Sequence, residues 1–375
     1  MDSYLVSSAH PMPSVAISPC HGPCGLHQVA PYIGKLRPSI SEFLLSKYTK
    51  LGDIVADPFC GSGTIPLDAV RLGRIPIAAD CSEYAIALTK AKLLPPASLE
   101  EAILRLENSL RQSKEIRVDL RSVPAWVRQF FHPETLRGTV AFVEVLKKNN
   151  EHFLLACLLG ILHHQRPGFL SYPSSHLVPY LRSTLFPRVQ FPELYEYRDI
   201  RSRMLRKIER TYKLMPPAHT REMFDERDIR IVTAKEIAIW KTVDAIVTSP
   251  PYMNALDYVR DNRLRLWFLS GSYQYPNSAE STRSRSGFTE LMKKFIRMVS
   301  TRMKIGGNCV VIVGETANRC RTKAHPAQVI WEQVREHSKL EVIDILSDEI
   351  PDIRRSRKEG RATKREIVLV IRRTS

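Results

Sequence analysis

The sequence lacks the features that would place a protein in a membrane or outside a cell. No apolar run reaches the roughly 18 residues that a membrane-spanning helix needs. The first residues, MDSYLVSSAHPMPSV, contain no charged region followed by an apolar one, so no secretory signal is expected. The seven cysteines are scattered and odd in number, which argues against a disulfide framework. We therefore expect a cytoplasmic protein with no membrane partner.

Acidic residues are also scarce. The 375 residues include 39 Asp and Glu against 56 Lys and Arg, which gives a net charge of +17. This excess predicts attraction to a polyanion, although charge alone does not separate DNA from RNA or from an acidic protein. With 43% hydrophobic residues, the chain is long enough for one large α/β domain or two smaller ones.

Strands and helices are expected to alternate in the first part of the chain. Apolar runs at 51–59 and 75–80 are typical of buried strands, and each is followed by a helical pattern. Such alternation predicts a parallel sheet with helices on its faces. Further strands are expected at 229–234, 243–248 and 308–315. The last two strands, 340–350 and 365–373, are joined too closely for a helical crossover and should be antiparallel neighbours.

Two segments depart from this alternation. Residues 1–30 are rich in Pro, Ser, His and Gly and are expected to form an irregular lead-in. Residues 97–226 show helical patterns without strands, which predicts a helical insertion. The sheet domain would then comprise residues 31–96 and 227–375.

The first chemical motif, DPFCGSGT, occupies residues 57–64. Gly61 and Gly63 lie where a strand turns into a helix and allow the backbone to approach a ligand closely. No Gly-Lys-Ser/Thr follows, and the third glycine of the dinucleotide pattern is absent. Asp57 can accept hydrogen bonds from an ammonium group, and Asp80 ends the next strand, where acids bind a ribose diol. An amino-acid head with a ribose describes S-adenosylmethionine; the alternative is a tight turn with a capping Asp.

The second motif, TSPPY, follows the strand at 243–248. Pro250 and Pro251 stiffen the backbone and remove two N–H donors, which leaves carbonyl acceptors. Ser249 adds a hydroxyl, and Tyr252 adds a ring face. This set suits an exocyclic amino group on a planar base, held by acceptors and stacked on the ring. The alternative is a proline-rich turn in which the tyrosine only packs.

Together these motifs resemble the amino-methylating DNA methyltransferases of the cytosine-N4/adenine-N6 group. PYIGKLRPSISEFLL leading into GDIVADPFCGSGT resembles the family's cofactor segment, and TVDAIVTSPPY its catalytic segment. The resemblance covers about residues 27–95 and 228–373. It implies an α/β fold with a Rossmann-like, seven-stranded, mostly parallel sheet and an antiparallel C-terminal hairpin. It also implies S-adenosyl-L-methionine as cofactor, base flipping and a prokaryotic cytoplasm.

The resemblance assigns roles to individual residues of this sequence. The catalytic site, which would bind the target nucleobase, would comprise Ser249, Pro250, Pro251 and Tyr252. The cofactor site would comprise Asp57, Phe59, Gly61, Gly63, Thr64 and Asp80, with Lys35 and Pro38 beside the methionine end. One departure is that Thr233, Ala234 and Lys235 stand where an acid is often found. Serine ahead of the prolines favours cytosine N4 over adenine N6.

Two basic runs are candidates for contact with DNA phosphates. They lie at 281–285 and 354–365, and the residues assigned to this contact are Arg283, Arg285, Arg354, Arg355, Arg357 and Lys358. The alternative for each run is a solvated face. A cluster of Cys20, His21, Cys24 and His27 lacks the spacing of a zinc finger, so no metal site is predicted.

The function expected from the sequence is direct methyl transfer from S-adenosylmethionine to cytosine N4 in DNA, with no covalent enzyme intermediate. Adenine-N6 methylation is the nearest alternative. An RNA or protein methyltransferase and a non-catalytic nucleic-acid-binding protein are more distant ones. The helical insertion is the candidate target-recognition region, and a restriction nuclease is a candidate partner besides DNA.

Overall fold

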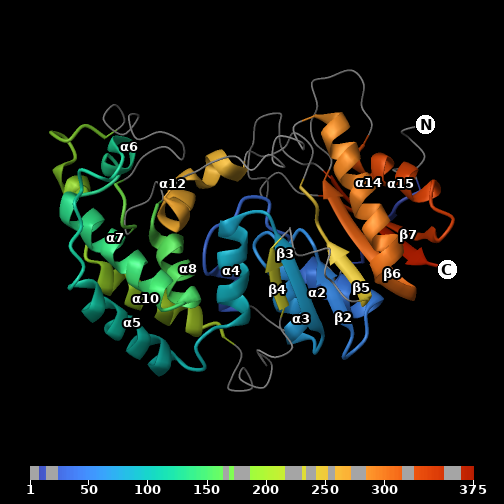
Figure 1. Ribbon diagram of the computed structural model, residues 1–375, viewed down its shortest axis with the longest axis horizontal. Helices are drawn as coiled ribbons and strands as arrows, with labels where there is room; N and C mark the ends of the chain where they lie inside the picture. The colour runs from blue at the N-terminus through green and yellow to red at the C-terminus, as the bar shows by residue number, and fades with distance from the viewer. Residues whose placement is uncertain are drawn as a thin grey trace.

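The computed structural model describes residues 8–13, 24–163, 169–172, 186–215, 230–233, 242–251, 258–271, 284–314, 325–349 and 365–375. Within these residues the chain builds one sheet of eight strands in the order β1-β7-β8-β6-β5-β2-β3-β4 (Figure 1). The strands are β1 (His10–Pro11), β2 (Ile54–Asp57), β3 (Ile75–Asp80), β4 (Arg230–Thr233), β5 (Val243–Thr248), β6 (Met303–Gly314), β7 (Leu340–Glu349) and β8 (Arg365–Arg373).

The strand directions confirm the predicted fold class. Strands β6, β5, β2, β3 and β4 pair in parallel, and β8 alone runs antiparallel to its neighbours β6 and β7. The register of the final hairpin runs from Leu340↔Arg373 to Glu349↔Arg365. The seven predicted strands are all present. The eighth, β1, is a two-residue addition that pairs in parallel with β7 and was not predicted.

Helices cover both faces of the sheet, so its central strands are apolar on both sides. Val55 and Val247 pack in the core beneath α2 (Pro38–Tyr48) and α3 (Thr64–Arg71). Their strand neighbours Ala56 and Ile246 face the opposite core. That core contains the apolar residues of α14 (Arg285–Arg302) and α15 (Pro326–Arg335). The period-two alternation of the strands therefore places α2 and α3 on one face and α14 and α15 on the other.

A block of helices stands beside the sheet, at the left of Figure 1. It shares one hydrophobic core with α4 (Glu83–Leu93), the helix that follows β3. Its helices are α5 (Leu99–Ser113), α6 (Ala125–Arg128), α7 (Pro133–Lys148), α8 (His152–Ile161), α10 (Ile200–Tyr212) and α12 (Tyr258–Ser270), with a short 3₁₀ turn, η3 (Pro192–Tyr195). The helix α12 comes from the segment after the TSPPY turn, so this block is built from both sides of β5 in sequence.

The lead-in is more ordered than expected. Within its described residues, Gly25–Gln28 form a 3₁₀ helix, η2, and the side chains of Leu26 and Val29 are fully buried. The backbone approaches its neighbours very closely here. A Cβ on Gly25 would lie 1.9 Å from the Thr211 carbonyl oxygen, and a Cβ on Gly160 would lie 2.3 Å from the Val29 oxygen. The apolar residues and these two glycines let the lead-in dock against α8 and α10.

None of the helices in the described part of the chain is long and apolar enough to span a membrane.

Candidate functional site

The two motifs lie at the carboxyl ends of neighbouring strands. β2 pairs with β5 through Val55↔Ala245 and Ala56↔Ile246. From β2 the chain proceeds to β3 and β4 on one side of the sheet, whereas β5 and β6 lie on the other side. The order of strands therefore reverses between β2 and β5. In open α/β sheets the ligand crevice lies at such a reversal, outside the carboxyl ends of the strands.

Asp57 ends β2 and is 2% exposed. The Thr248 hydroxyl at the end of β5 donates a hydrogen bond to its Oδ1 atom at 2.6 Å, and the Phe59 backbone N–H approaches the same atom at 3.3 Å. Burial raises the pKa of Asp57 from 3.8 to about 7, although both hydrogen bonds favour the ionised form. The carboxyl group is thus poised to ionise when a cation approaches.

The glycine turn that follows Asp57 requires glycine at two positions. Gly61 and Gly63 have φ values of +49° and +72°, in the left-handed region that other residues avoid. A Cβ on Gly63 would also lie 2.7 Å from the Thr89 hydroxyl oxygen, on α4. Thr64 is the first residue of α3, and its hydroxyl lies 3.0 Å from that of Ser62. The turn therefore brings bare backbone to the end of the sheet.

Asp80 ends β3 and holds the glycine turn in place. Its Oδ2 accepts a hydrogen bond from the Gly61 N–H at 2.9 Å, and its Oδ1 accepts one from the Ser82 N–H at 2.8 Å. Burial raises the pKa of Asp80. Each carboxylate oxygen has a second lone pair, so these bonds leave acceptor capacity for a diol.

The remaining predicted cofactor residues surround this turn. The Lys35 ammonium donates to the His27 carbonyl at 2.7 Å, and burial lowers its pKa. Pro38 occupies the first turn of α2, where its missing N–H costs no hydrogen bond. Phe59 is half-buried, and its ring centroid lies 5.7 Å from that of Phe295 on α14.

The structure describes three of the four predicted residues of the base site. Ser249 and Pro251 are half-buried and Pro250 is buried, directly after β5. Tyr252 lies outside the described residues. So do five of the six residues assigned to DNA phosphates, namely Arg283, Arg354, Arg355, Arg357 and Lys358.

Arg285 is the one described residue of the predicted phosphate contacts. It is exposed and begins α14, after Ser284 caps that helix, so it does not lie on a connection as expected. It lines an open groove together with Lys293, and with the carboxylates of Glu290 and Glu336. These acidic neighbours make the groove less favourable for a phosphate than the basic run alone suggested.

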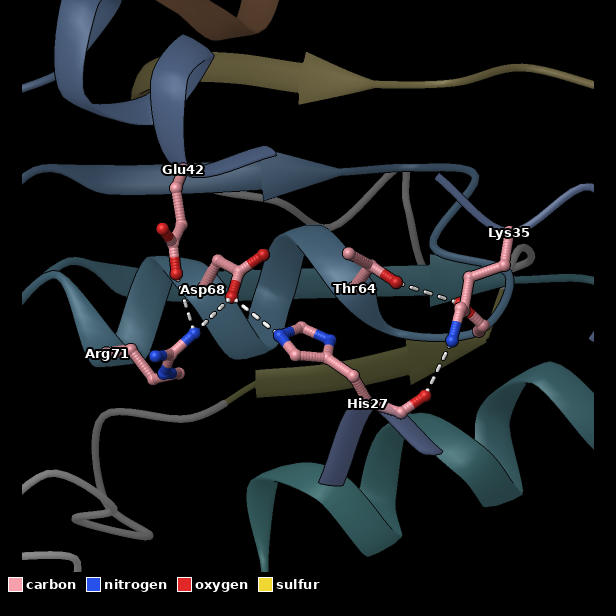
Figure 2. A network of polar contacts seen from close by, with 7 residues as sticks. His27, Lys35, Glu42, Thr64, Asp68 and Arg71 are labelled. Carbon is pink, nitrogen blue, oxygen red and sulfur yellow. Dashed lines mark hydrogen bonds and ion pairs between the residues drawn. The ribbon is translucent and has the colours of Figure 1, made fainter. Parts of the chain in front are cut away.

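A buried polar network beneath the glycine turn was not predicted. The His27 ring lies 2.9 Å from Asp68 Oδ1, and Arg71 lies 3.1 Å from the same oxygen and 2.8 Å from Glu42 (Figure 2). Burial lowers the pKa of His27 despite Asp68. The network joins the lead-in to α3. Its sequence signal is faint: Asp68 and Arg71 are three residues apart on one face of an otherwise apolar helix.

Tyr32 is a second residue that the sequence did not single out. A Cβ on Gly61 would lie 3.4 Å from its ring, so the ring sits against the glycine turn. The ring stacks on Tyr84 with centroids 5.9 Å apart, and the Tyr84 hydroxyl donates to the Pro31 carbonyl at 2.7 Å. These contacts hold the lead-in over the turn.

No group of three metal-ligating side chains capable of holding an ion occurs among the described residues. Cys20 and His21 of the N-terminal cluster lie outside them.

Known proteins match this chain over the segment that contains the glycine turn. Residues 38–91 match the family model of the N6/N4 methyltransferases, described as DNA methylase. A type II methyltransferase of Methanocaldococcus jannaschii, M.MjaII, is 35% identical over 68 residues, which cover 18% of this chain and 13% of that relative. The predicted resemblance to amino-methylating DNA methyltransferases is confirmed over this segment. The cofactor prediction is confirmed with it, because DNA methylases take their methyl group from S-adenosylmethionine.

Solved structures match this chain only loosely. TrmN from Thermus thermophilus is 12% identical, with a TM-score of 0.37, over 93% of this chain and 52% of that one. A TehB-like, S-adenosylmethionine-dependent methyltransferase from Corynebacterium glutamicum is 9% identical, with a TM-score of 0.32, over 89% and 87% of the two chains. Scores this low carry no argument, so the fold rests on the strand order described above.

Proposed function

We propose that this protein transfers a methyl group from S-adenosylmethionine to the exocyclic N4 of cytosine in DNA. The observation that carries the proposal is the contact between Asp57 and Thr248. This hydrogen bond sets the start of the glycine turn beside the start of the SPPY turn, across the point where the strand order reverses. A donor bound at one turn and a base bound at the other would meet there.

The residues around the glycine turn fit the proposed cofactor. Asp57 is a buried carboxyl group whose ionisation an ammonium group would favour, as the amino-acid end of the cofactor supplies. Asp80 keeps acceptor capacity for the ribose diol, and Gly61 and Gly63 offer backbone without side chains. When bound, the cofactor supplies an electrophilic methyl group. The protein's contribution is to orient the two reactants and exclude water.

The SPPY turn would hold the nucleophile. The amino group of a base is a weak nucleophile because its lone pair is delocalised into the ring. Carbonyl oxygens of the rigid turn and the Ser249 hydroxyl can accept both of its N–H bonds and favour a pyramidal nitrogen. In-line attack would form the N–C bond as the S–C bond breaks, and the proton that the methylated nitrogen loses would pass to solvent. Stacking on Tyr252 would hold the flipped base in place.

The choice of cytosine over adenine rests on Ser249, which stands where an Asp or Asn would favour adenine. The choice of DNA as substrate rests on the family match over residues 38–91 and on the net charge of +17. Basic residues at 354–358 and at 283–285 would contact phosphates. The helices of 97–226 would recognise the target sequence, and a cognate restriction nuclease would complete the system.

The decisive experiment incubates the protein with methyl-labelled S-adenosylmethionine and unmethylated genomic DNA, followed by nucleoside mass spectrometry. We expect labelled N4-methylcytosine. Labelled N6-methyladenine would overturn the choice of base while keeping the DNA methyltransferase activity. Parallel incubations with RNA and with a protein mixture provide the comparison, because label found there alone would overturn DNA as the substrate.

A further inference from the structure

A fully buried lysine lies on α4, beneath the glycine turn. Lys92 is 1% exposed, and its Nζ atom has no hydrogen-bond partner. It lies one turn after Thr89, whose hydroxyl is 3.4 Å from the sulfur of Cys60 in the glycine turn. An ammonium group buried without a partner is costly to the folded state. Such a group lowers its cost by losing its proton, and groups of this kind are concentrated at functional sites.

The groups around Lys92 do not supply that compensation. It interacts electrostatically with Lys35 and Cys24 of the lead-in, with Asp68 of α3 and with Cys60. Burial raises the pKa of both cysteines, so they stay neutral thiols. The one carboxylate among these groups is Asp68, whose Oδ1 lies within hydrogen-bond distance of His27 and Arg71. Its Oδ2 has no hydrogen-bond partner, so it forms no hydrogen bond with Lys92 either.

The buried and half-buried charges beneath the glycine turn do not balance. Lys207 of α10 adds a further positive charge facing Lys35, and its ammonium donates to the Gln28 carbonyl at 2.7 Å. With His27 neutral and the other groups ionised, the cluster contains four cations and two carboxylates. These groups are Lys35, Lys92, Lys207 and Arg71 against Glu42 and Asp68. Positive charge is therefore in excess directly beneath the turn that is proposed to bind the cofactor.

We propose that Lys92, with Lys35, forms an anion subsite for the carboxylate of the cofactor's amino-acid end, and that this carboxylate draws a proton onto Lys92. The inference rests on the proposed function, because it assumes that this amino acid lies on the glycine turn. Asp57 would face the ammonium group of that amino acid, and the two lysines would balance its carboxylate. Lys92 acts across the glycine turn as a positioning residue.

Proton uptake is the signature of this arrangement. Burial, and then Lys35, lower the pKa of Lys92 to about 7, so most molecules carry a neutral Lys92 at pH 8. An anion bound nearby favours the charged form. Binding at pH 8 should then take up about 0.9 proton on Lys92, the neutral fraction that a pKa of about 7 gives. Asp57, with a pKa of about 7, is mostly ionised at that pH and releases little.

The test is titration calorimetry of the full chain at pH 8, in buffers of different ionisation enthalpy. The probes are S-adenosylhomocysteine and 5′-methylthioadenosine, which lacks the amino-acid end. For Lys92→Met we expect a Kd for S-adenosylhomocysteine raised about 10-fold to 100-fold, as for a lost charge-assisted interaction, and no proton uptake. The Kd for methylthioadenosine should not change.

Lys90→Met is the matched control, because Lys90 lies on the same helix but is half-buried. It should bind both probes as the unaltered protein does. Lys92→Met should also keep or raise the melting temperature, since methionine replaces a buried amine that has no hydrogen-bond partner. Equal weakening of both probes, or equal proton uptake in the Lys92→Met protein, would overturn the inference. If the unaltered protein binds neither probe, the proposed function itself fails.

Discussion

The hydroxyl of Thr248 donates a hydrogen bond to the carboxylate of Asp57 at 2.6 Å, across 191 residues of sequence. The bond joins the ends of β5 and β2, which are adjacent parallel strands. Both groups are buried, so water does not compete with the bond. The ionisation of Asp57, which we propose to bind the cofactor, is thereby linked to the position of the turn that starts at Ser249.

The first prediction concerns this hydroxyl. Thr248→Val keeps the shape of the side chain but removes the donor that favours ionised Asp57, so the pKa of Asp57 should rise above about 7. Binding of S-adenosylhomocysteine should weaken roughly 10-fold at pH 7, the cost of one hydrogen bond to a charged group. When the affinity for S-adenosylhomocysteine is measured from pH 6 to 9, the midpoint of its pH dependence should lie at a higher pH in the variant. Thr248→Ser, which keeps the donor, should retain the original midpoint; an unmoved midpoint in the valine variant would refute the link.

The second prediction concerns Asp57 itself and the pH dependence of stability. The folded protein retains the Asp57 proton up to about pH 7, whereas the unfolded chain loses it near 3.8. Stability contributed by this group is therefore lost as the pH rises between these values. Asp57→Asn should stabilise the apo protein at pH 8 by roughly 2–4 kcal/mol, the order of a shift of about three pKa units, and should have little effect below pH 4. Thermal unfolding at both pH values measures this.

Asp244 provides a control of opposite sign. Burial raises its pKa, but the hydrogen bonds from Lys304 and the Ile54 N–H, with the charge of Lys304, together outweigh burial, and the net shift is downward. Asp244→Asn should therefore destabilise the protein at neutral pH, with an effect that fades as the pH falls below 3.8. In contrast to Asp244→Asn, the Asp57→Asn variant should also lose affinity for S-adenosylhomocysteine at pH 8. Stabilisation without that loss would remove Asp57 from the cofactor site.

Local patterns predicted more of this protein than long-range ones. The strand at 75–80 has the predicted bounds, because a short apolar run between turns is a local signal. The start of α14 at Arg285 is a weaker local signal, since its first turn is polar and only the Ser284 cap marks it. The glycine turn was predicted from contiguous residues.

The polar network could not be predicted in this way. His27 and Asp68 are 41 residues apart, and their contact depends on how the lead-in docks on α3. The buried position of Lys92 had a local signal, because it lies four residues after Leu88 on the apolar side of α4. The absence of a hydrogen-bond partner for the Lys92 ammonium depends on how three separate segments pack together. The hydrophobic periodicity of one helix cannot predict this.

The third prediction concerns Ser249. Ser249→Ala removes one acceptor for the amino group of the base, so the rate of methyl transfer should fall roughly 100-fold or more, as when one polar group that acts on the transition state is lost. The Kd for S-adenosylhomocysteine should remain unchanged, because the cofactor residues lie on the other turn. Single-turnover methylation and calorimetry measure the two quantities. Equal losses in both would point to a structural role for the turn.

The fourth prediction separates backbone strain from steric exclusion at the glycine turn. Gly63 and Gly52 have similar φ values, +72° and +80°, so an alanine at either position meets a similar backbone penalty of roughly 1–2 kcal/mol. A Cβ at residue 52 meets nothing within 4 Å, whereas a Cβ at residue 63 would lie 2.9 Å from the Cα of Thr89. Gly63→Ala must therefore move α4 away from α3, and that movement would also displace the turn held by Asp80. Chemical denaturation should show Gly63→Ala to be less stable than Gly52→Ala, and only Gly63→Ala should weaken binding of S-adenosylhomocysteine. Equal stability of the two variants would mean that the contact with Thr89 relaxes without cost.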